Sequence, residues 1–253
     1  MKTPEIVTKE QALAARRAFL LEEKGFTRAR DELARKRREL PWVRIDKHYE
    51  FASANGREAL GDLFAGRRQL IVQHFMFGPE WNEGCVGCSF NADHVDGAIP
   101  HIQARDATFV AVSRAPLAKL QQFQERMGWR FKWVSSHGTD FNYDFDVSFR
   151  KEDIATGRAQ YNYRPLDFEI EDLSGYSIFC KNREGEIFHT YSTFARGDEM
   201  LSTAYMYIDL LPMGRNEDGL KEPSSWWRHH EKYTEGTGDK DSDPSAIKQC
   251  GCS

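Results

Sequence analysis

Two continuous apolar runs constrain the fold of this chain more than any other feature. The runs LIVQHFMF (residues 70–77) and ATFVAVS (residues 107–113) each have the length of one strand, and neither alternates regularly between apolar and polar residues. A strand without a polar face must be covered on both sides, as in sheets flanked by helices. Helical patterns follow both runs, so the sequence predicts an α/β domain with a central mixed sheet between helices.

Other elements are expected around these two strands. Residues 5–40 have a helical pattern with a capping box of Thr8 and Gln11, and Gly25 and Thr27 are expected to break this helix in two. The remaining expected elements are a strand near 49–51 with a turn at 55–56, a short helix at 60–64, a helix-like segment at 86–99, a helix at 116–127, a strand at 131–135, a hairpin at 176–192 and a closing helix at 198–211. Residues 137–173 fit no element and are expected to form an insertion before the hairpin.

These patterns predict three parts of the chain. Residues 1–44 are expected to form an N-terminal helical arm, residues 45–212 the α/β domain, and residues 213–253 a C-terminal extension. From Thr234 the extension is polar and is expected to be disordered.

Charge and the first residues bear on the partners of the chain. The net charge is −4, which provides no basic field for nucleic acid, and the opening MKTPEIVTKEQ has no apolar run of the kind that a signal peptide or a membrane helix requires. We therefore expect a cytoplasmic protein that binds neither nucleic acid nor membrane, whereas the sequence gives no indication of its oligomeric state. In a reducing compartment, closely spaced cysteines tend to be catalytic or metal-binding.

Cys85 and Cys88 form a CxxC motif that follows the first buried strand and opens a helical pattern. At a helix start, backbone N–H groups and the helix dipole stabilise a thiolate, and a second cysteine one turn later is close enough to form a disulfide. We expect Cys85 to be the accessible attacking thiol and Cys88 the resolving thiol. The expected partners are protein or small-molecule thiols and disulfides, and no cofactor is needed.

Four segments give the chain a specific resemblance. They are HFMFGPEWNEGCVGCSFNADHVDGA, RDATFVAVSRAPLAKL, RMGWRFKWVSS and DFNYDFDVSF. Over roughly residues 5–230 the chain resembles a large bacterial family of thioredoxin-like proteins, catalogued as a domain of unknown function and predicted to be dithiol-disulfide oxidoreductases. The resemblance implies a thioredoxin-like fold and a redox role, and it singles out only Cys85 and Cys88.

The chain departs from the wider thioredoxin superfamily at one position. That superfamily usually has a cis-proline before the strand that faces the CxxC, where it helps to bind substrate, whereas this chain has Leu173, Ser174 and Gly175 before YSIF. Gly175 lacks a Cβ atom and would permit a similar close approach of substrate to the backbone.

Two alternatives to redox chemistry stay open. Cys85 and Cys88 together with Cys250 and Cys252 make four zinc ligands, and a thioredoxin-like binding module with inert cysteines would have the same pattern.

Four further residues are expected to have lesser roles. Trp81 is expected to wall the site, while His74 is either a proton relay or, more simply, a hydrogen-bonded core residue. Cys250 and Cys252 lie in a polar tail and would be a mobile shuttle for electrons, or an incidental pair.

Overall fold

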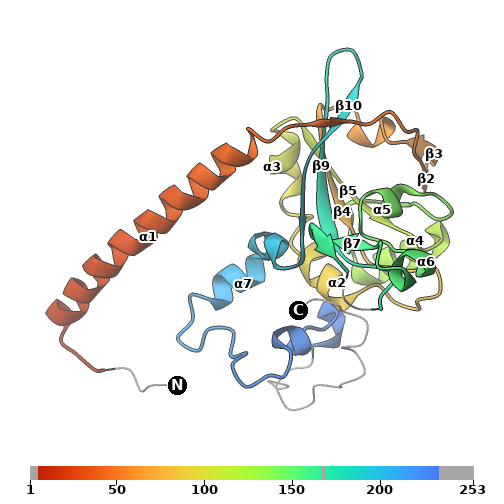
Figure 1. Cartoon of the computed structure of the whole chain (residues 1–253). Coiled ribbons are helices and arrows are strands. Elements are labelled where there is room, and N and C mark those ends of the chain that lie inside the picture. The colour runs from red at the N-terminus through yellow and green to blue at the C-terminus, as the bar shows by residue number, and fades with distance from the viewer. Residues whose placement is uncertain (1–4, 167–168, 234–253) are drawn as a thin grey trace. The chain divides into compact units, whose positions relative to one another are not determined.

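A computed structural model of the chain describes residues 5–166 and 169–233 (Figure 1). These residues divide into two compact units, one that ends at Pro41 and one that begins at Trp42. Among the described helices, none combines the length and the apolar character needed to cross a membrane.

The first unit is one long helix, α1 (Lys9–Arg37). The expected capping box is present, since the Gln11 N–H donates to the Thr8 side chain and the Gln11 side chain accepts from the Thr8 N–H. The expected break at Gly25 and Thr27 is wrong. An interior glycine costs a helix only about 1 kcal/mol, and the Thr27 hydroxyl donates to the Glu23 carbonyl oxygen within the same helix (3.0 Å).

The second unit is built on an eight-stranded mixed sheet with the strand order β1-β10-β9-β4-β5-β6-β2-β3. Its strands are β1 (Val43–Arg44), β2 (Glu50–Ser53), β3 (Gly56–Ala59), β4 (Gln69–His74), β5 (Ala107–Ser113), β6 (Lys132–Ser135), β9 (Gly175–Lys181) and β10 (Ile187–Phe194). The α-helices of this unit are α2 (Val86–Ala92), α3 (Ile99–Gln103), α4 (Leu117–Met127), α5 (Phe141–Asp144), α6 (Lys151–Ala155) and α7 (Thr203–Ile208). Short 3-10 helices are η1 (Asp62–Phe64), η2 (Ala195–Leu201), η3 (Pro223–Trp226) and η4 (His230–Lys232).

The connections give this sheet a thioredoxin-like topology. Strand β4 pairs parallel with β5 and antiparallel with β9, and β9 and β10 form a hairpin. Along the chain, β4, the CxxC helix α2, β5 and α4 are followed by β6 and the insertion, and then by the hairpin, with α1 as an N-terminal extension. The expected α/β, thioredoxin-like fold class is therefore confirmed.

Three expected elements differ in detail. Helix α2 ends at Ala92, and Pro100 lies in the first turn of the separate helix α3, where its missing N–H is harmless. The closing helix is reduced to α7, with η2 before it. The insertion at 137–173 contains α5, α6 and a small hairpin of β7 (Gln160–Tyr161) and β8 (Arg164–Pro165).

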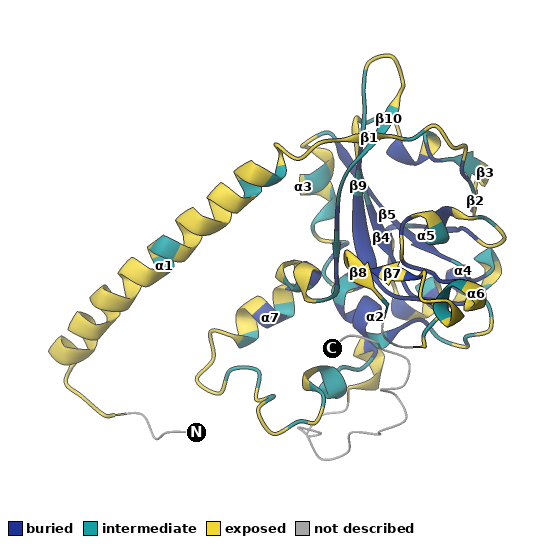
Figure 2. Ribbon diagram, in the orientation of Figure 1, coloured by how far each residue is buried: buried dark blue, intermediate teal, exposed yellow. Residues whose placement is uncertain are grey.

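Strand β4 is covered on both faces, as its continuous apolar sequence predicts. Leu70 and Val72 belong to one buried cluster, while Ile71 packs against the other, which contains both cysteines of the motif. Figure 2 shows the central strands as the most buried part of this unit. The CxxC helix therefore lies over the Ile71 face of β4.

Gly175, the first residue of β9, lies against β10. A Cβ atom built on Gly175 would lie 2.5 Å from Cδ1 of Phe194, so the space that was expected to admit a substrate backbone is filled by a core ring. The glycine is required by packing at this position.

We therefore expect Gly175→Ala to destabilise the protein by about 1–3 kcal/mol, because the Phe194 ring must shift within a packed core. Urea unfolding followed by circular dichroism measures the change. The matched control is Gly97→Ala, since Gly97 is exposed and a Cβ atom there meets nothing within 4 Å. Equal midpoints for the two variants would show that Phe194 does not require a glycine here.

Candidate functional site

Helix α2 starts at Cys85, which is its N-cap residue. The Cys85 N–H donates to the Met76 carbonyl oxygen (2.9 Å), which ties the start of the helix to the segment directly after β4. On the other side, the Cys85 carbonyl oxygen accepts from the Ser89 N–H (3.0 Å) and the Ser89 hydroxyl (2.9 Å). The position of Cys85 is therefore set by hydrogen bonds from both directions.

Cys88 lies one turn further along α2 and is tied to the same strand end. Its Sγ atom accepts from the Met76 N–H (3.4 Å), and its carbonyl oxygen accepts from the Gln73 side-chain amide (3.2 Å). Residues three apart share one face of a helix. Both thiols therefore belong to one buried cluster at the end of β4.

The two thiols are buried. Cys85 is 3% exposed and Cys88 2%, so the expectation of an accessible Cys85 is wrong for this structure. Both side chains lie within an apolar cluster that includes Phe75, Met76 and Ala92. A segment that we call the cap packs beside this cluster. The cap comprises residues 223–233, with η3 and η4, and it packs against α2, α4 and the loop before the CxxC.

Hydrogen bonding holds the cap directly beside the motif. The buried His229 donates from Nε2 to the carbonyl oxygen of Gly84 (2.9 Å), and its Nδ1 accepts from Arg126 (3.2 Å). A carbonyl can only accept and a guanidinium can only donate, so these partners require the neutral imidazole with its proton on Nε2. Burial lowers the pKa of His229, which favours the same form.

Aromatic stacking is the second contact of the cap. The Trp227 ring stacks on Phe90 of α2, with centroids 5.0 Å apart and an interplanar angle of 7°. Trp226 and Tyr205 also contact Phe90, at centroid distances of 5.6 and 5.2 Å. Phe90 is thereby enclosed by aromatic rings, and α2 is covered on this side.

A negative charge near the CxxC, which would oppose formation of a thiolate, is paired with two cations. Glu83 lies two residues before Cys85, and its carboxylate pairs with Arg126 of α4 (2.7 Å) and Lys232 of the cap (2.8 Å). Burial alone would raise the pKa of Glu83, but the hydrogen bonds from Lys232 and Arg126 lower it to about 2. The negative charge near the motif is therefore matched by two cations.

The structure does not bring His74 to the thiols. The residue lies on β4, and its ring contacts Phe141 and Phe145 of the cluster that lacks the cysteines. Its Nε2 is 2.8 Å from the Ser177 hydroxyl, and burial lowers its pKa to about 3. His74 is therefore a neutral core residue on the opposite face of the sheet.

The remaining expected site residues have mixed positions. Trp81 is half-buried and packs against the cluster of Cys85 and Cys88, which fits a wall of the site. Cys250 and Cys252 lie outside the described residues. Within residues 5–166 and 169–233, no three His, Cys, Asp or Glu side chains are grouped as metal ligands.

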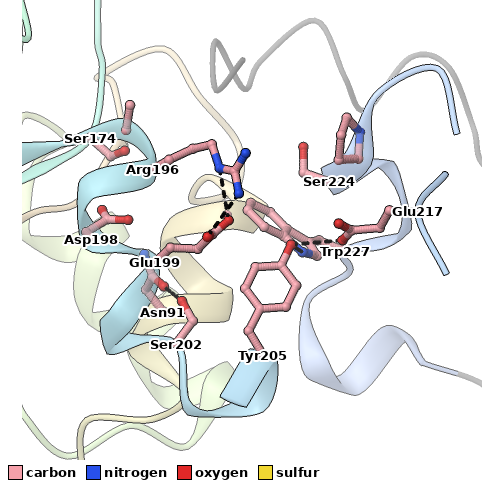
Figure 3. Close-up of a pocket in the computed structure, with 13 residues that line it drawn as sticks. Asn91, Ser174, Arg196, Asp198, Glu199, Ser202, Tyr205, Glu217, Ser224 and Trp227 are labelled. Carbon is pink, nitrogen blue, oxygen red and sulfur yellow. Dashed lines mark hydrogen bonds and ion pairs between the residues drawn. The ribbon is translucent and has the colours of Figure 1, made fainter. Parts of the chain in front are cut away.

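A cavity of about 340 Å³ adjoins the motif, and sequence reasoning missed it. It is lined by Gly87, one of the two residues between the cysteines, and by residues of η2, α7 and the cap. Figure 3 shows Asp198 and Glu199 on one side and Tyr205, Glu217 and Trp227 on the other. The run SSWWRHHEKY is the one sequence signal of this wall, because it is aromatic within an otherwise polar extension.

Asp198 is the most perturbed acid of the cavity. It is buried, and burial raises its pKa to about 7, although a hydrogen bond with Asn91 of α2 acts in the opposite direction. Burial therefore favours the neutral carboxyl of Asp198 at pH values where an exposed aspartate is ionised.

We expect Trp227→Ala to raise the alkylation rate of Cys85 and Cys88 about tenfold or more, because it removes the stack on Phe90 and favours opening of the cap. Iodoacetamide labelling followed by peptide mapping gives the rate for each thiol. Trp42→Ala is the control, since Trp42 is exposed and contacts Phe188 instead. An unchanged rate in Trp227→Ala would show that the cap does not limit access.

The pKa of Asp198 predicts how stability depends on pH. An aspartate carboxyl ionises near pH 4 in an unfolded chain and at about 7 in this fold, so the folded protein holds an extra proton between those values. Its contribution to the free energy of unfolding is present below pH 4 and is lost as pH rises through 7.

The Asp198→Asn variant should not show this decline. Its free energy of unfolding minus that of wild type should therefore be larger at pH 8 than at pH 4, by up to about 4 kcal/mol. Urea unfolding of both proteins across this range measures the difference. Asp218→Asn, at an exposed aspartate, controls for the loss of one charge. Parallel pH profiles for wild type and Asp198→Asn would refute the raised pKa.

Comparisons with known proteins give one family and several distant structural likenesses. A peroxidoxin, BcpB from Mycobacterium tuberculosis, has a TM-score of 0.41 and 14% identity over 65% of this chain and 95% of its own. A PrxQ mutant from Xylella fastidiosa has a TM-score of 0.40 and 15% identity, over 63% of this chain and 89% of its own. The mitochondrial 2-Cys peroxiredoxin from Plasmodium falciparum has a TM-score of 0.39 and 12% identity, over 66% of this chain and 92% of its own.

Likenesses at this level carry no argument about activity. No curated protein matches the chain. A family model does match, over residues 1–233, which is most of the sequence. The chain therefore belongs to the family described as bacterial protein of unknown function, DUF899.

Proposed function

We propose that this protein exchanges disulfides through Cys85 and Cys88. The observation that carries the proposal is the joint anchoring of the two cysteines. They lie one turn apart at the start of α2, and the backbone of Met76 bonds to both residues, through its carbonyl oxygen to Cys85 and through its N–H to the sulfur of Cys88. Two thiols held on one helix face after a rigid central strand are preorganised to close a small disulfide.

Cys85 is the attacking thiol in this proposal. As the N-cap residue it lies beside the first backbone N–H groups of α2, which favour a thiolate. The carboxylate of Glu83 is already paired with Arg126 and Lys232, so it opposes a thiolate less than an unpaired carboxylate would. Cys88 then attacks Cys85 and releases the reduced product.

The cap must move before exchange can occur. At 3% exposure Cys85 is out of reach of a disulfide. The cap is held by ring contacts with Phe90 and Phe123, by hydrogen bonds and by partly exposed ion pairs. Such contacts open locally far more often than a core strand. We therefore propose that opening of residues 223–233 controls access to the thiols.

A second candidate is a thioredoxin-like binding module with inert cysteines. The burial of both thiols favours it, because buried cysteines commonly serve as small apolar side chains. The zinc alternative needs Cys250 and Cys252, which lie outside the described residues. About one zinc per chain in reduced protein, lost in Cys85→Ser, would favour that alternative.

We expect Cys88→Ser to accumulate mixed disulfides in the cell and Cys85→Ser to accumulate none. Without Cys88 the intermediate on Cys85 is not resolved, whereas without Cys85 no attack takes place. Non-reducing gels and mass spectrometry of the purified variants detect the adducts.

Cys180→Ser serves as the control for this experiment, because Cys180 lies on β9, away from the motif in the chain, and burial raises its pKa. A double variant with Cys180→Ser and Cys88→Ser should accumulate as much mixed disulfide as Cys88→Ser alone. Equal trapping by the Cys85 and Cys88 variants would contradict the assignment, and no adduct in either would favour the binding module.

A further inference from the structure

The cavity beside the CxxC has two acidic side chains that pair with no cation among the described residues, Glu217 and the buried Asp198. Its one guanidinium, Arg196, pairs with Glu199 (3.2 Å), and Glu199 also pairs with Arg215 (3.1 Å). Arg215 in turn pairs with Asp209 (2.8 Å), so these two arginines and two acids neutralise one another.

Glu217 and Asp198 remain outside that network. The Glu217 carboxylate accepts from two neutral donors, the Tyr205 hydroxyl (3.1 Å) and Trp226 Nε1 (2.7 Å). Asp198 is 7% exposed and bonds to the side chain of Asn91. Among the described residues, no Lys, Arg or His pairs with either acid.

The rest of the wall is shaped for an organic group. Tyr205 and Trp227 line the cavity, and the Arg215 guanidinium lies over the Tyr205 ring, 3.7 Å from its centroid. The volume of about 340 Å³ is in the range of small-molecule sites. Aromatic walls with a carboxylate attract ammonium groups. Gly87 lines the cavity, whereas neither cysteine of the motif does. An occupant therefore lies against the backbone of the motif, and its disulfide reaches Cys85 when the cap opens.

We propose that this cavity binds the ammonium group of a small amine-bearing disulfide, with Glu217 as its principal acidic contact. The claim that the substrate is a disulfide rests on the proposed exchange function. The claim that the cavity binds an organic diamine does not. The dependence on Glu217 separates this inference from a general attraction of the acidic protein for cations.

The exchange step is balanced without any bound cofactor. The Cys85 thiolate attacks one sulfur of the ligand, a new S–S bond forms to Cys85, and the other half of the ligand leaves as a thiolate that takes up a proton. The Cys88 thiolate then attacks Cys85 and releases the second aminothiol. Two electrons pass from the dithiol to the ligand, and dithiothreitol restores the dithiol in the assay.

The binding test uses a ligand that has no sulfur. Diaminohexane resembles cystamine, with two methylenes in place of the two sulfurs, and hexanediol is its neutral counterpart. Calorimetry with the full chain should detect binding of diaminohexane, about tenfold weaker binding to Glu217→Gln, and no binding of hexanediol. Glutamine keeps the oxygen that accepts from Tyr205 and Trp226, so the wall is preserved.

The exchange test compares three disulfides of similar size: cationic cystamine, neutral hydroxyethyl disulfide and anionic dithiodiglycolate. Each rate in wild type is divided by the rate in Glu217→Gln, which removes the intrinsic reactivity of the disulfide. The ratio should be about ten for cystamine and near one for the neutral disulfide. Glu184→Gln, an exposed acid in the β9–β10 turn, should leave every rate unchanged.

The outcomes separate the inference from the function on which it rests. Diaminohexane that fails to bind, or binds wild type and Glu217→Gln equally, overturns the cation site. Equal rate ratios for all three disulfides overturn the charge preference. Selective diamine binding with no reduction of any disulfide supports the cation site and refutes the exchange function instead.

Discussion

The site depends on how the end of β4 holds the start of α2. Met76 lies two residues after the end of β4, and its backbone bonds to Cys85 and to the sulfur of Cys88. Because β4 is buried on both faces and paired on both edges, its end is firmly held by the sheet and the core. Rigid strands that present a functional turn are a common way to position reactive groups.

Burial of the thiols strengthens their hydrogen bonds but keeps partner molecules away from them. The apolar cluster around Cys85 and Cys88 excludes water, which strengthens any hydrogen bond to sulfur, but it also removes the thiols from contact with a partner. In our proposal the cap separates these two effects, since it is a short segment and its ion pair with Glu83 is partly exposed. Under this proposal a closed cap protects the pair and an open cap lets it react.

The sequence predicted the sheet well because the signals were local. The apolar run of 70–77 supplies β4 as far as His74, and the run of 107–113 became β5. Gly128, with φ of 67°, ends α4 as a left-handed cap residue. The capping box of Thr8 and Gln11 was found in place. These features depend on neighbouring residues only.

The site was predicted only in part, because its other residues come from distant segments. No local pattern indicates that Trp227 stacks on Phe90, or that Asp198 lies buried in a cavity with Gly87. Gly175 was assigned to substrate approach because its lack of a side chain is visible in the sequence, whereas the Phe194 ring that requires it is visible only in the fold. Contacts of this kind are tertiary and have no periodicity.

The central claim is that Cys85 and Cys88 form a reversible redox pair, and a titration against glutathione buffers tests it most directly. The protein is equilibrated at a series of thiol-to-disulfide ratios, quenched with acid and mapped by peptide mass spectrometry. The account predicts that both thiols are lost together into one Cys85–Cys88 disulfide, with a single reversible midpoint. Thiols that stay reduced at every ratio, or that form only separate glutathione adducts, would contradict it.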